Sequence, residues 1–366
     1  MEHRLLLIVF LLCAFLSSAT LSGMVIPRIL SRSIRKGRCD KPDYRKMHKG
    51  YASRLGGVSF LPEMLFSIAL VVAFYFLSEA NDFFTFSSIP WPRWLFLLVA
   101  AGIIYATGVI DDLRTLNYRV KLIALLAASV CVVASGLHFQ NLGGLLFLNA
   151  LPFWLDTLIT ILFFIGIVVA VNLIDGIDGL ASGLSSIMLI YYGSWFIILG
   201  QYSYALGVFA LLGVIVPFFF YNTYKKTTRH RIFMGDAGSM TLGMSLALCA
   251  LFFLESNTGE ASDVRLISAV APLFIPCFDA LRVFAFRMYL GVSPFHPDMN
   301  HLHHKLVKIY NSQNIARRII LLVAICYLLS NLVLSRFVNV NLLILVDAVL
   351  YILWNISLTK RIKKQK

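Results

Sequence analysis

LITILFFIGIVVAVNLIDGIDGLASG, residues 158–183, joins a long apolar run to a polar segment. It continues an apolar run that begins near residue 153, and a helix needs roughly 20 such residues to cross about 30 Å of hydrocarbon. Asp175 and Asp178 follow directly after this run. A charged side chain at the centre of a membrane helix costs about 2.5–3.5 kcal/mol on insertion scales. The stretch therefore predicts a membrane-spanning helix that ends in a polar turn with a structural or chemical task.

The same pattern recurs along the whole chain. Hydrophobic residues make up 59% of the sequence and charged residues 14%, whereas about a quarter of the residues in a soluble domain are charged. We expect an all-α polytopic integral membrane protein that forms a single membrane-embedded domain over residues 1–366. About eleven transmembrane helices are expected, near residues 5–30, 57–78, 93–110, 121–138, 153–171, 179–199, 203–223, 238–255, 264–286, 316–335 and 338–358.

The distribution of lysine and arginine predicts the orientation. If the loops after the odd-numbered helices and the C-terminal tail share one face, that face holds 28 of the 32 basic residues. Because basic residues are concentrated in cytoplasmic loops, we expect this face to be cytoplasmic and the N-terminus to lie outside. The first 23 residues also resemble a secretory signal, but cleavage would leave the first basic loop outside, so we expect an uncleaved helix.

The formal net charge of +14 does not indicate nucleic-acid binding. The basic residues are spread over the ends of loops, as the predicted topology requires, and form no separate basic domain. Membrane lipids and anionic substrates are therefore the expected partners.

Four polar motifs follow apolar runs, and all of them fall on the predicted cytoplasmic face. The motifs are GVIDDLR (108–114), NLIDGIDGLASG (172–183), FMGDAGSM (233–240) and SPFHPDMNHLHHK (293–305). The orientation was derived from basic residues alone, so the common placement of these acidic and histidine-rich motifs is independent of it. We expect the four motifs to form one site.

Asp111 and Asp112 are adjacent carboxylates, which repel each other unless a cation or a shared proton lies nearby. Such a pair suits a metal site, a general base, or both. The simpler interpretation is a helix end solvated by water, with Arg114 balancing the charge.

Asp175 and Asp178 are three residues apart, so they share a face if this segment is helical. Asp178 is also a plausible N-cap of the next helix, but a cap explains neither Asp175 nor Asn172. Asp236 either caps the following helix or binds a metal. Mg²⁺ prefers oxygen ligands and usually binds through one or two carboxylates plus substrate phosphates, so Asp236 with Asn172 or Asp175 is a candidate magnesium site.

The segment 296–304 holds four of the eight histidines. It is either a zinc site or, as we prefer, a cluster of hydrogen-bond donors for phosphate or sugar hydroxyls, formed by His301, His303 and His304. Most basic residues of this face are explained by orientation alone. Among them, Lys121, His48 and Arg54 are retained as candidate substrate-binding residues.

Together, the four motifs resemble the polyprenyl-phosphate N-acetylhexosamine-1-phosphate transferase family, with RKMHKGYASRLGG (45–57) as a further match. The resemblance covers nearly the whole chain. It implies transfer of a sugar-1-phosphate from a UDP-N-acetylhexosamine to undecaprenyl phosphate, which releases UMP and initiates cell-envelope glycan synthesis at the bacterial cytoplasmic membrane. It also implies Mg²⁺, or alternatively Mn²⁺, as the cofactor and leaves a homodimer open.

The resemblance also implies residue roles. Asp236 matches the metal-binding aspartate, with Asn172 as a second ligand. Asp111, Asp112, Asp175 and Asp178 match the catalytic carboxylates, of which the first two are expected to bind or deprotonate the lipid phosphate. Phe233 resembles the aromatic residue that stacks on uracil, and Lys121 resembles the lysine near the phosphates. The remaining substrate-binding candidates are His48, Arg54, His301, His303 and His304.

The histidine motif also bears on the choice of donor. Leu302 interrupts the histidines, whereas the branch that uses UDP-MurNAc-pentapeptide for peptidoglycan usually has three in a row. We therefore favour UDP-GlcNAc or a related amino sugar over the peptidoglycan donor. A transporter is the alternative from another class, but it would place ionisable groups near the midplane, where Asp347 is the only obvious candidate.

Overall fold

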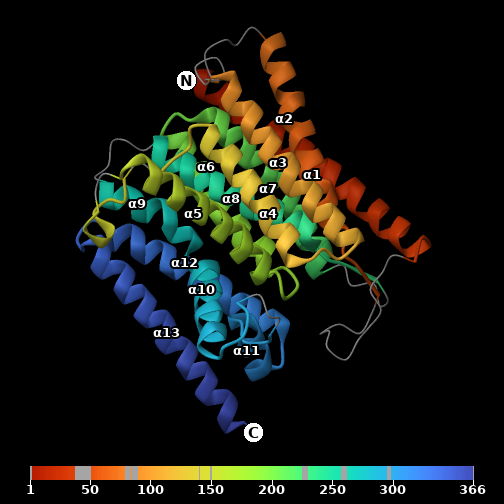
Figure 1. The fold of residues 1–366 in the computed structure, drawn as a ribbon. Coiled ribbons are helices and arrows are strands. Elements are labelled where there is room, and N and C mark those ends of the chain that lie inside the picture. The colour runs from red at the N-terminus through yellow and green to blue at the C-terminus, as the bar shows by residue number, and fades with distance from the viewer. Residues whose placement is uncertain are drawn as a thin grey trace.

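The computed structural model of the protein describes residues 2–37, 51–78, 84, 90–139, 141–148, 151–224, 230–256, 262–294 and 298–365. Most of this part of the chain is helical, and the long helices form one bundle (Figure 1). The α-helices are α1 (Glu2–Arg35), α2 (Phe60–Leu77), α3 (Trp91–Leu113), α4 (Tyr118–Ala134), α5 (Phe153–Ile174), α6 (Leu180–Ile198), α7 (Tyr202–Thr223), α8 (Gly235–Ser256), α9 (Ser262–Val270), α10 (Phe274–Tyr289), α11 (Leu302–Tyr310), α12 (Gln313–Leu334) and α13 (Val340–Lys364).

Within the described residues, ten helical segments are long and apolar enough to cross a membrane. The prediction of an all-α polytopic membrane protein is thereby confirmed. The one expected span that is not among these ten is the fourth, near residues 121–138, which corresponds to α4. α4 has 17 residues and is about 25 Å long at 1.5 Å per residue, slightly shorter than the hydrocarbon core. The exact number of crossings and the orientation in the membrane stay predictions. The two chain ends lie at opposite ends of the bundle (Figure 1).

α8 is the most deeply buried of these segments and packs against α3 and α5. Small residues allow these close approaches. A Cβ atom at Gly108 would lie 2.5 Å from the Cα atom of Ala237, and one at Gly243 would lie 2.7 Å from the Cα atom of Val168. Close contact through small residues is a common way to pack membrane helices. It fixes the position of α8 and therefore of Asp236 in its first turn.

Two short strands, β1 (Tyr51–Ser53) and β2 (His230–Ile232), pair in parallel just before α2 and α8. The pairing continues into the following loops, where Gly56 N–H donates to the Phe233 carbonyl at 3.0 Å and Gly57 N–H donates to the Met234 carbonyl at 2.8 Å. This small sheet, which we did not predict from the sequence, holds the segment around Arg54 next to the start of α8.

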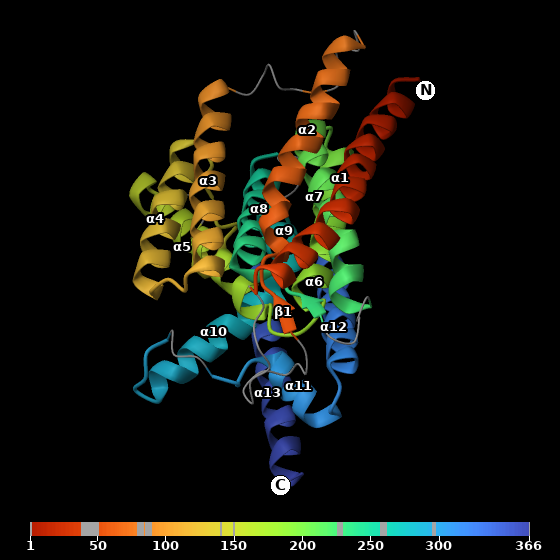
Figure 2. The same cartoon turned by 90° about the vertical axis from the view of Figure 1, so that its right-hand side faces the viewer.

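The span before the histidine motif is bent. The 3₁₀ turn Ala271–Leu273 separates α9 from α10, and Pro272 and Pro276 lie at this bend, where each proline removes a backbone donor. α10 and α11 project from the bundle at the end where β1 lies (Figure 2). We call this end the site end.

On the neighbouring α13, Asp347 contacts α12, because the Tyr327 hydroxyl donates to its main-chain oxygen at 3.2 Å.

Candidate functional site

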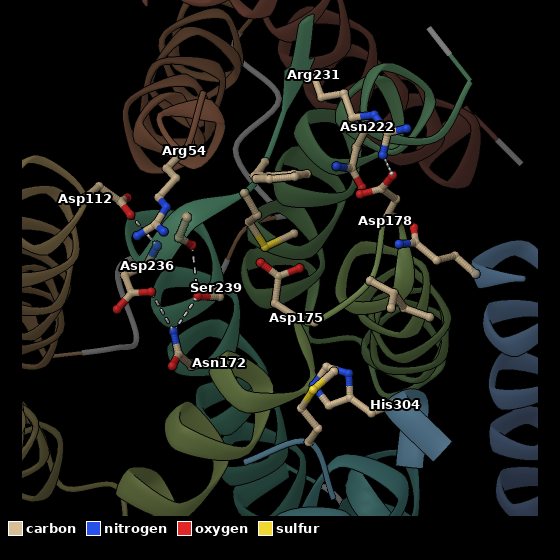
Figure 3. A pocket seen from close by; sticks show the side chains of 17 residues that line it. Arg54, Asp112, Asn172, Asp175, Asp178, Asn222, Arg231, Asp236, Ser239 and His304 are labelled. Atoms are coloured by element: carbon tan, nitrogen blue, oxygen red, sulfur yellow. Dashed lines mark hydrogen bonds and ion pairs between the residues drawn. The ribbon is translucent and has the colours of Figure 1, made fainter. Parts of the chain in front are cut away.

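The four polar motifs come together at the site end, around a polar cavity of about 400 Å³. The cavity lies between the end of α3, the turn from α5 to α6, the first turn of α8 and the loop before α11 (Figure 3). Eight of the residues predicted for the site line this cavity: Arg54, Asp112, Asn172, Asp175, Asp178, Phe233, Asp236 and His304. His48 lies outside the described residues.

Asp112 is bound to the beginning of α8. One of its carboxylate oxygens accepts the backbone N–H of Asp236 at 2.8 Å, and the other accepts that of Ala237 at 2.9 Å. Gly235 has a φ of +71°, and a Cβ atom there would lie 2.6 Å from the Asp112 oxygens. A carboxylate in this position satisfies free N–H groups and complements the positive end of the helix dipole. Asp112 therefore positions Asp236, in addition to the catalytic role predicted for it.

Lys121 provides the cation that the acidic pair requires. Its ammonium lies 2.7 Å from Asp111 Oδ2 and also pairs with Asp236. Asp111 additionally accepts the backbone N–H of Leu116 at 2.6 Å. The site thus places one ammonium between two carboxylates from separate helices, and the neutralising residue is Lys121 rather than the Arg114 of the simpler interpretation.

Asn172 completes the surroundings of Asp236. Its amide nitrogen lies 3.2 Å from Asp236 Oδ1 and 2.8 Å from Ser239 Oγ (Figure 3). Ser239 is one helical turn from Gly235, whose carbonyl accepts its hydroxyl at 3.0 Å. We did not single out Ser239 from the sequence, although it lies in the same motif as Asp236 and offers another oxygen ligand.

Asp175 points into the middle of the cavity from the turn between α5 and α6 (Figure 3). Withdrawal from bulk water, together with the negative charges of Asp236, Asp178 and Asp112, raises its pKa to about 7. A carboxyl group with a pKa near the operating pH can exchange a proton readily. Asp175 therefore has the properties expected of a general base or acid.

Asp178 is held by basic residues from two other segments. Arg231 of β2 lies 3.3 Å from its carboxylate, and Arg317 of α12 donates to its main-chain oxygen at 2.8 Å. The residue that caps α6 is Gly179, and no side chain caps that end. The alternative that Asp178 acts as an N-cap is therefore wrong. The sequence offered no local signal for Arg231 or Arg317, because both are remote in the chain.

Asp279 anchors the histidine motif. It pairs with Arg282, three residues further along α10, at 2.9 Å. Its carboxylate also lies 2.8 Å from His301 Nδ1 and accepts the backbone N–H of Leu302 at 3.0 Å and the hydroxyl of Tyr351 at 2.9 Å. His301 is therefore held inside the protein and does not line the polar cavity.

His303 is also buried, with 1% of its surface exposed. Its ring lies directly against Gly176, so that a side chain at this position would overlap the imidazole. Burial lowers the pKa of His303 well below its usual range, and burial likewise lowers the pKa of His304. Both rings are therefore neutral at pH 7. Of His301, His303 and His304, only His304 lines the polar cavity, because His301 is held by Asp279 and His303 packs against Gly176.

A second, apolar cavity of about 230 Å³ adjoins the polar one. It lies between α4, α5, α8 and α10, and Asn172 lines both cavities. Most of its lining is apolar, with Lys121 and Arg287 as the basic members. Arg287 is held in place by Asp298, whose carboxylate lies 2.8 Å from its guanidinium.

The comparisons with known proteins agree with the motif resemblance. The model of glycosyl transferase family 4 matches residues 94–254. The undecaprenyl-phosphate alpha-N-acetylglucosaminyl 1-phosphate transferase of Yersinia pestis is 28% identical over 286 residues, which cover 75% of this chain and 71% of that protein. The protein of the same name from Escherichia coli K12 is 29% identical over 280 residues, which cover 74% and 70%.

A third relative covers more of the chain. The probable undecaprenyl-phosphate N-acetylglucosaminyl 1-phosphate transferase of Bacillus subtilis is 28% identical over 347 residues, which cover 92% of this chain and 87% of that protein. The resemblance to this transferase family is confirmed. The comparisons support a membrane-embedded sugar-phosphate transferase and favour it over the transporter.

Proposed function

We propose that this protein transfers N-acetylglucosamine-1-phosphate from UDP-N-acetylglucosamine to undecaprenyl phosphate, on the cytoplasmic side of a bacterial inner membrane. The products are undecaprenyl-diphosphate-N-acetylglucosamine and UMP, and the lipid product would initiate a cell-envelope glycan. The names of the relatives support this choice of donor and acceptor.

The observation that carries the proposal is the pair of cavities that meet at Asn172. The polar cavity opens at the site end and has the size and charged lining that a nucleotide sugar needs. The apolar cavity lies between membrane helices, where a prenyl chain can enter from the bilayer. Lys121 and Arg287 line the apolar cavity, so they are placed to attract the phosphate of the acceptor. This arrangement allows a water-soluble donor and a lipid acceptor to react at one point.

The donor set near Asp236 fits Mg²⁺. The side-chain amide of Asn172 lies next to oxygen atoms of Asp236 and Ser239, and the Lys121 ammonium occupies a position between two carboxylates. In the described part of the chain, no three His, Cys, Asp or Glu side chains form a complete metal site. A magnesium site in phosphate enzymes usually takes one or two carboxylates, and substrate phosphates and waters provide the remaining ligands. When bound, the ion would neutralise phosphate charge and polarise the phosphoryl group under attack.

The residues of the site have separate tasks in the proposed reaction. An oxygen of the lipid phosphate attacks the phosphorus bonded to the sugar, and the bond from that phosphorus to the bridging oxygen breaks. UMP leaves with the bonding electron pair. Two unit charges about 5 Å apart repel by roughly 3 kcal/mol at an effective dielectric near 20, so Lys121 and Arg287 would reduce the repulsion between the two substrates. Asp111 holds Lys121, and Asp112 holds the first turn of α8.

Asp175 would accept the proton of a lipid phosphate that arrives as the monoanion, because its pKa is raised to about 7. Phosphate monoesters have a second pKa near 6, so only a fraction of the acceptor requires this step at neutral pH. Phe233 and Arg54 line the cavity beside β1 and β2 and would contact the uracil ring and the diphosphate of the donor, respectively.

The purified protein in detergent provides the test. UMP release is measured with UDP-N-acetylglucosamine, undecaprenyl phosphate and Mg²⁺, and each component is omitted in turn. We expect UMP only when all three are present, together with a lipid product that contains the sugar. UMP release without the lipid, or no release with any UDP-N-acetylhexosamine, would contradict the proposal. The peptidoglycan donor UDP-MurNAc-pentapeptide is the matched control and should give no product.

A further inference from the structure

A third cavity, which is apolar, has no role in the proposed reaction. It has a volume of about 520 Å³ and lies farther along α8, away from the site end. Its walls are formed by α2, α3, α6, α7 and α8. It exceeds the polar cavity in volume, so it is far larger than an ordinary packing defect between helices.

The cavity is accessible from the membrane. α2 packs on α7 and α3 packs on α8, whereas α2 and α3 stand apart with α8 visible between them (Figure 2). At this opening, Leu65 of α2 is 36% exposed and Leu98 of α3 is 52% exposed, while Leu211 on the opposite wall is 1% exposed. The cavity is therefore a slot that leads from the lipid-facing surface to the core.

The slot is free of side chains at Gly207. A Cβ atom added to this glycine of α7 would meet nothing within 4 Å. The few polar atoms of the wall include the hydroxyl of Ser245, which is bonded to the Thr241 carbonyl at 2.9 Å. A water molecule needs two to four polar partners to stay in a cavity, and most of this wall is apolar. A hydrocarbon chain, by contrast, is abundant in a bilayer and matches the apolar lining.

The end of the slot that is far from the site end carries one positively and one negatively charged side chain. Tyr204 lines the slot, stacks on Phe252 with 4.0 Å between ring centroids, and lies close to Arg93 and Glu255. The guanidinium of Arg93 pairs with Glu255 at 2.9 Å, and both side chains are partly exposed. Trp94 lines the slot nearby, and tryptophan and tyrosine are typical of the membrane interface.

We propose that this slot binds an acyl chain of phosphatidylethanolamine, with the head group next to Arg93 and Glu255. The phosphate of this lipid matches the guanidinium, its ammonium matches the carboxylate, and its acyl chain fills the space between α2 and α3. The lipid would act as a wedge that supports α8, the helix that carries Asp236. This inference does not depend on the proposed reaction.

The test uses phosphatidylethanolamine with a photoreactive diazirine in one acyl chain, incorporated into nanodiscs with the full-length protein. Labelled residues are located by mass spectrometry after irradiation. We expect labelling to concentrate on slot residues such as Met64 and Met244. Gly207→Leu places a side chain in the slot and should reduce this labelling several-fold.

Gly102→Leu is the matched control, because Gly102 is exposed on α3 and a Cβ atom there also meets nothing within 4 Å. It should leave the labelling of the slot unchanged. Glu255→Gln should reduce the preference for phosphatidylethanolamine over phosphatidylglycerol. Equal labelling of wild type and Gly207→Leu would overturn the proposal. So would specific labelling of the slot by a photoreactive polyprenyl phosphate instead, or cross-links from the slot to a second copy of the chain. All three variants are first compared with wild type for thermal stability in the same nanodiscs.

Discussion

The carboxylate cluster (Asp111, Asp112, Lys121 and Asp236) and the histidine motif (residues 301–304) are both polar groups at the site end, but they are built differently. In the carboxylate cluster, charged side chains from α3, α4 and α8 contact one another beside the cavities. In the histidine motif, His301 and His303 are buried, and only His304 lines the polar cavity. Motif residues of equal prominence in the sequence can therefore serve chemistry in one region and support the structure in another.

The largest effect is expected for Asp236→Asn. This variant removes the charge that pairs with Lys121 and that would bind the metal, so turnover should fall on the order of 10³-fold, as for loss of a central electrostatic contact. The rate of UMP release measures this loss. Thermal stability should be retained, because asparagine has nearly the same shape and relieves repulsion among the carboxylates. A rate within tenfold of wild type would mean that the activation free energy rises by less than about 1.4 kcal/mol. This result would show that Asp236 does not have its assigned role.

Asp112→Asn should affect both turnover and stability, which distinguishes it from Asp236→Asn. Its carboxylate accepts two N–H groups of α8, whereas an amide offers only one acceptor oxygen. Loss of a helix cap typically costs about 1 kcal/mol, so the midpoint of thermal unfolding should decrease. Turnover should fall by about 10²-fold, because a small misplacement of a catalytic group has a cost of this size. Unchanged stability would show that Asp112 does not hold α8.

The pH dependence of kcat/KM tests Asp175. A carboxyl group is protonated below its pKa, and the pKa of Asp175 is raised to about 7. If Asp175 accepts a proton, kcat/KM should rise between pH 6 and pH 8 and level off above pH 8. Below the pKa, the rise should be about tenfold for each pH unit. Asp175→Asn should be slow and lack this rise. An identical pH profile in the variant would assign the transition to another group.

Substitutions of His303, which is buried, and of His304, which lines the polar cavity, should give the smallest and most distinct effects. His304→Ala should raise the KM for the donor by about tenfold, which corresponds to one hydrogen bond to a substrate at roughly 1.4 kcal/mol, and leave stability unchanged. His303→Ala should lower thermal stability, because it leaves a space behind Gly176. The KM for the donor and the KM for the lipid acceptor should change in parallel in this variant. A donor-specific effect of His303→Ala would show that this ring reaches the substrate.

Much of this arrangement could be predicted from the sequence, for physical reasons. The ends of the apolar runs locate the polar turns of Asp111, Asp175 and Asp236, because charged groups are excluded from the membrane core. Repulsion between adjacent carboxylates predicts a nearby cation, and Lys121 provides it.

The remaining features depend on contacts between distant segments. Asp279 binds the histidine motif 22 residues later in the chain, and Arg231 and Arg317 reach Asp178 from β2 and α12. The pairing of β1 with β2 involves three residues in each strand, which is too short for a periodic pattern. Such contacts follow from the packing of the helices and leave no local signature.

The central claim is that donor and acceptor occupy separate cavities that meet at Asn172. The most direct test measures both KM values in Val169→Phe, which fills the apolar cavity, and in Val130→Phe, which adds the same ring to an exposed position of α4. The account predicts that Val169→Phe raises the KM for undecaprenyl phosphate by about tenfold, or roughly 1.4 kcal/mol, with no change for UDP-N-acetylglucosamine, and that Val130→Phe changes neither. An equal increase in both KM values, or no increase for the lipid, would contradict it.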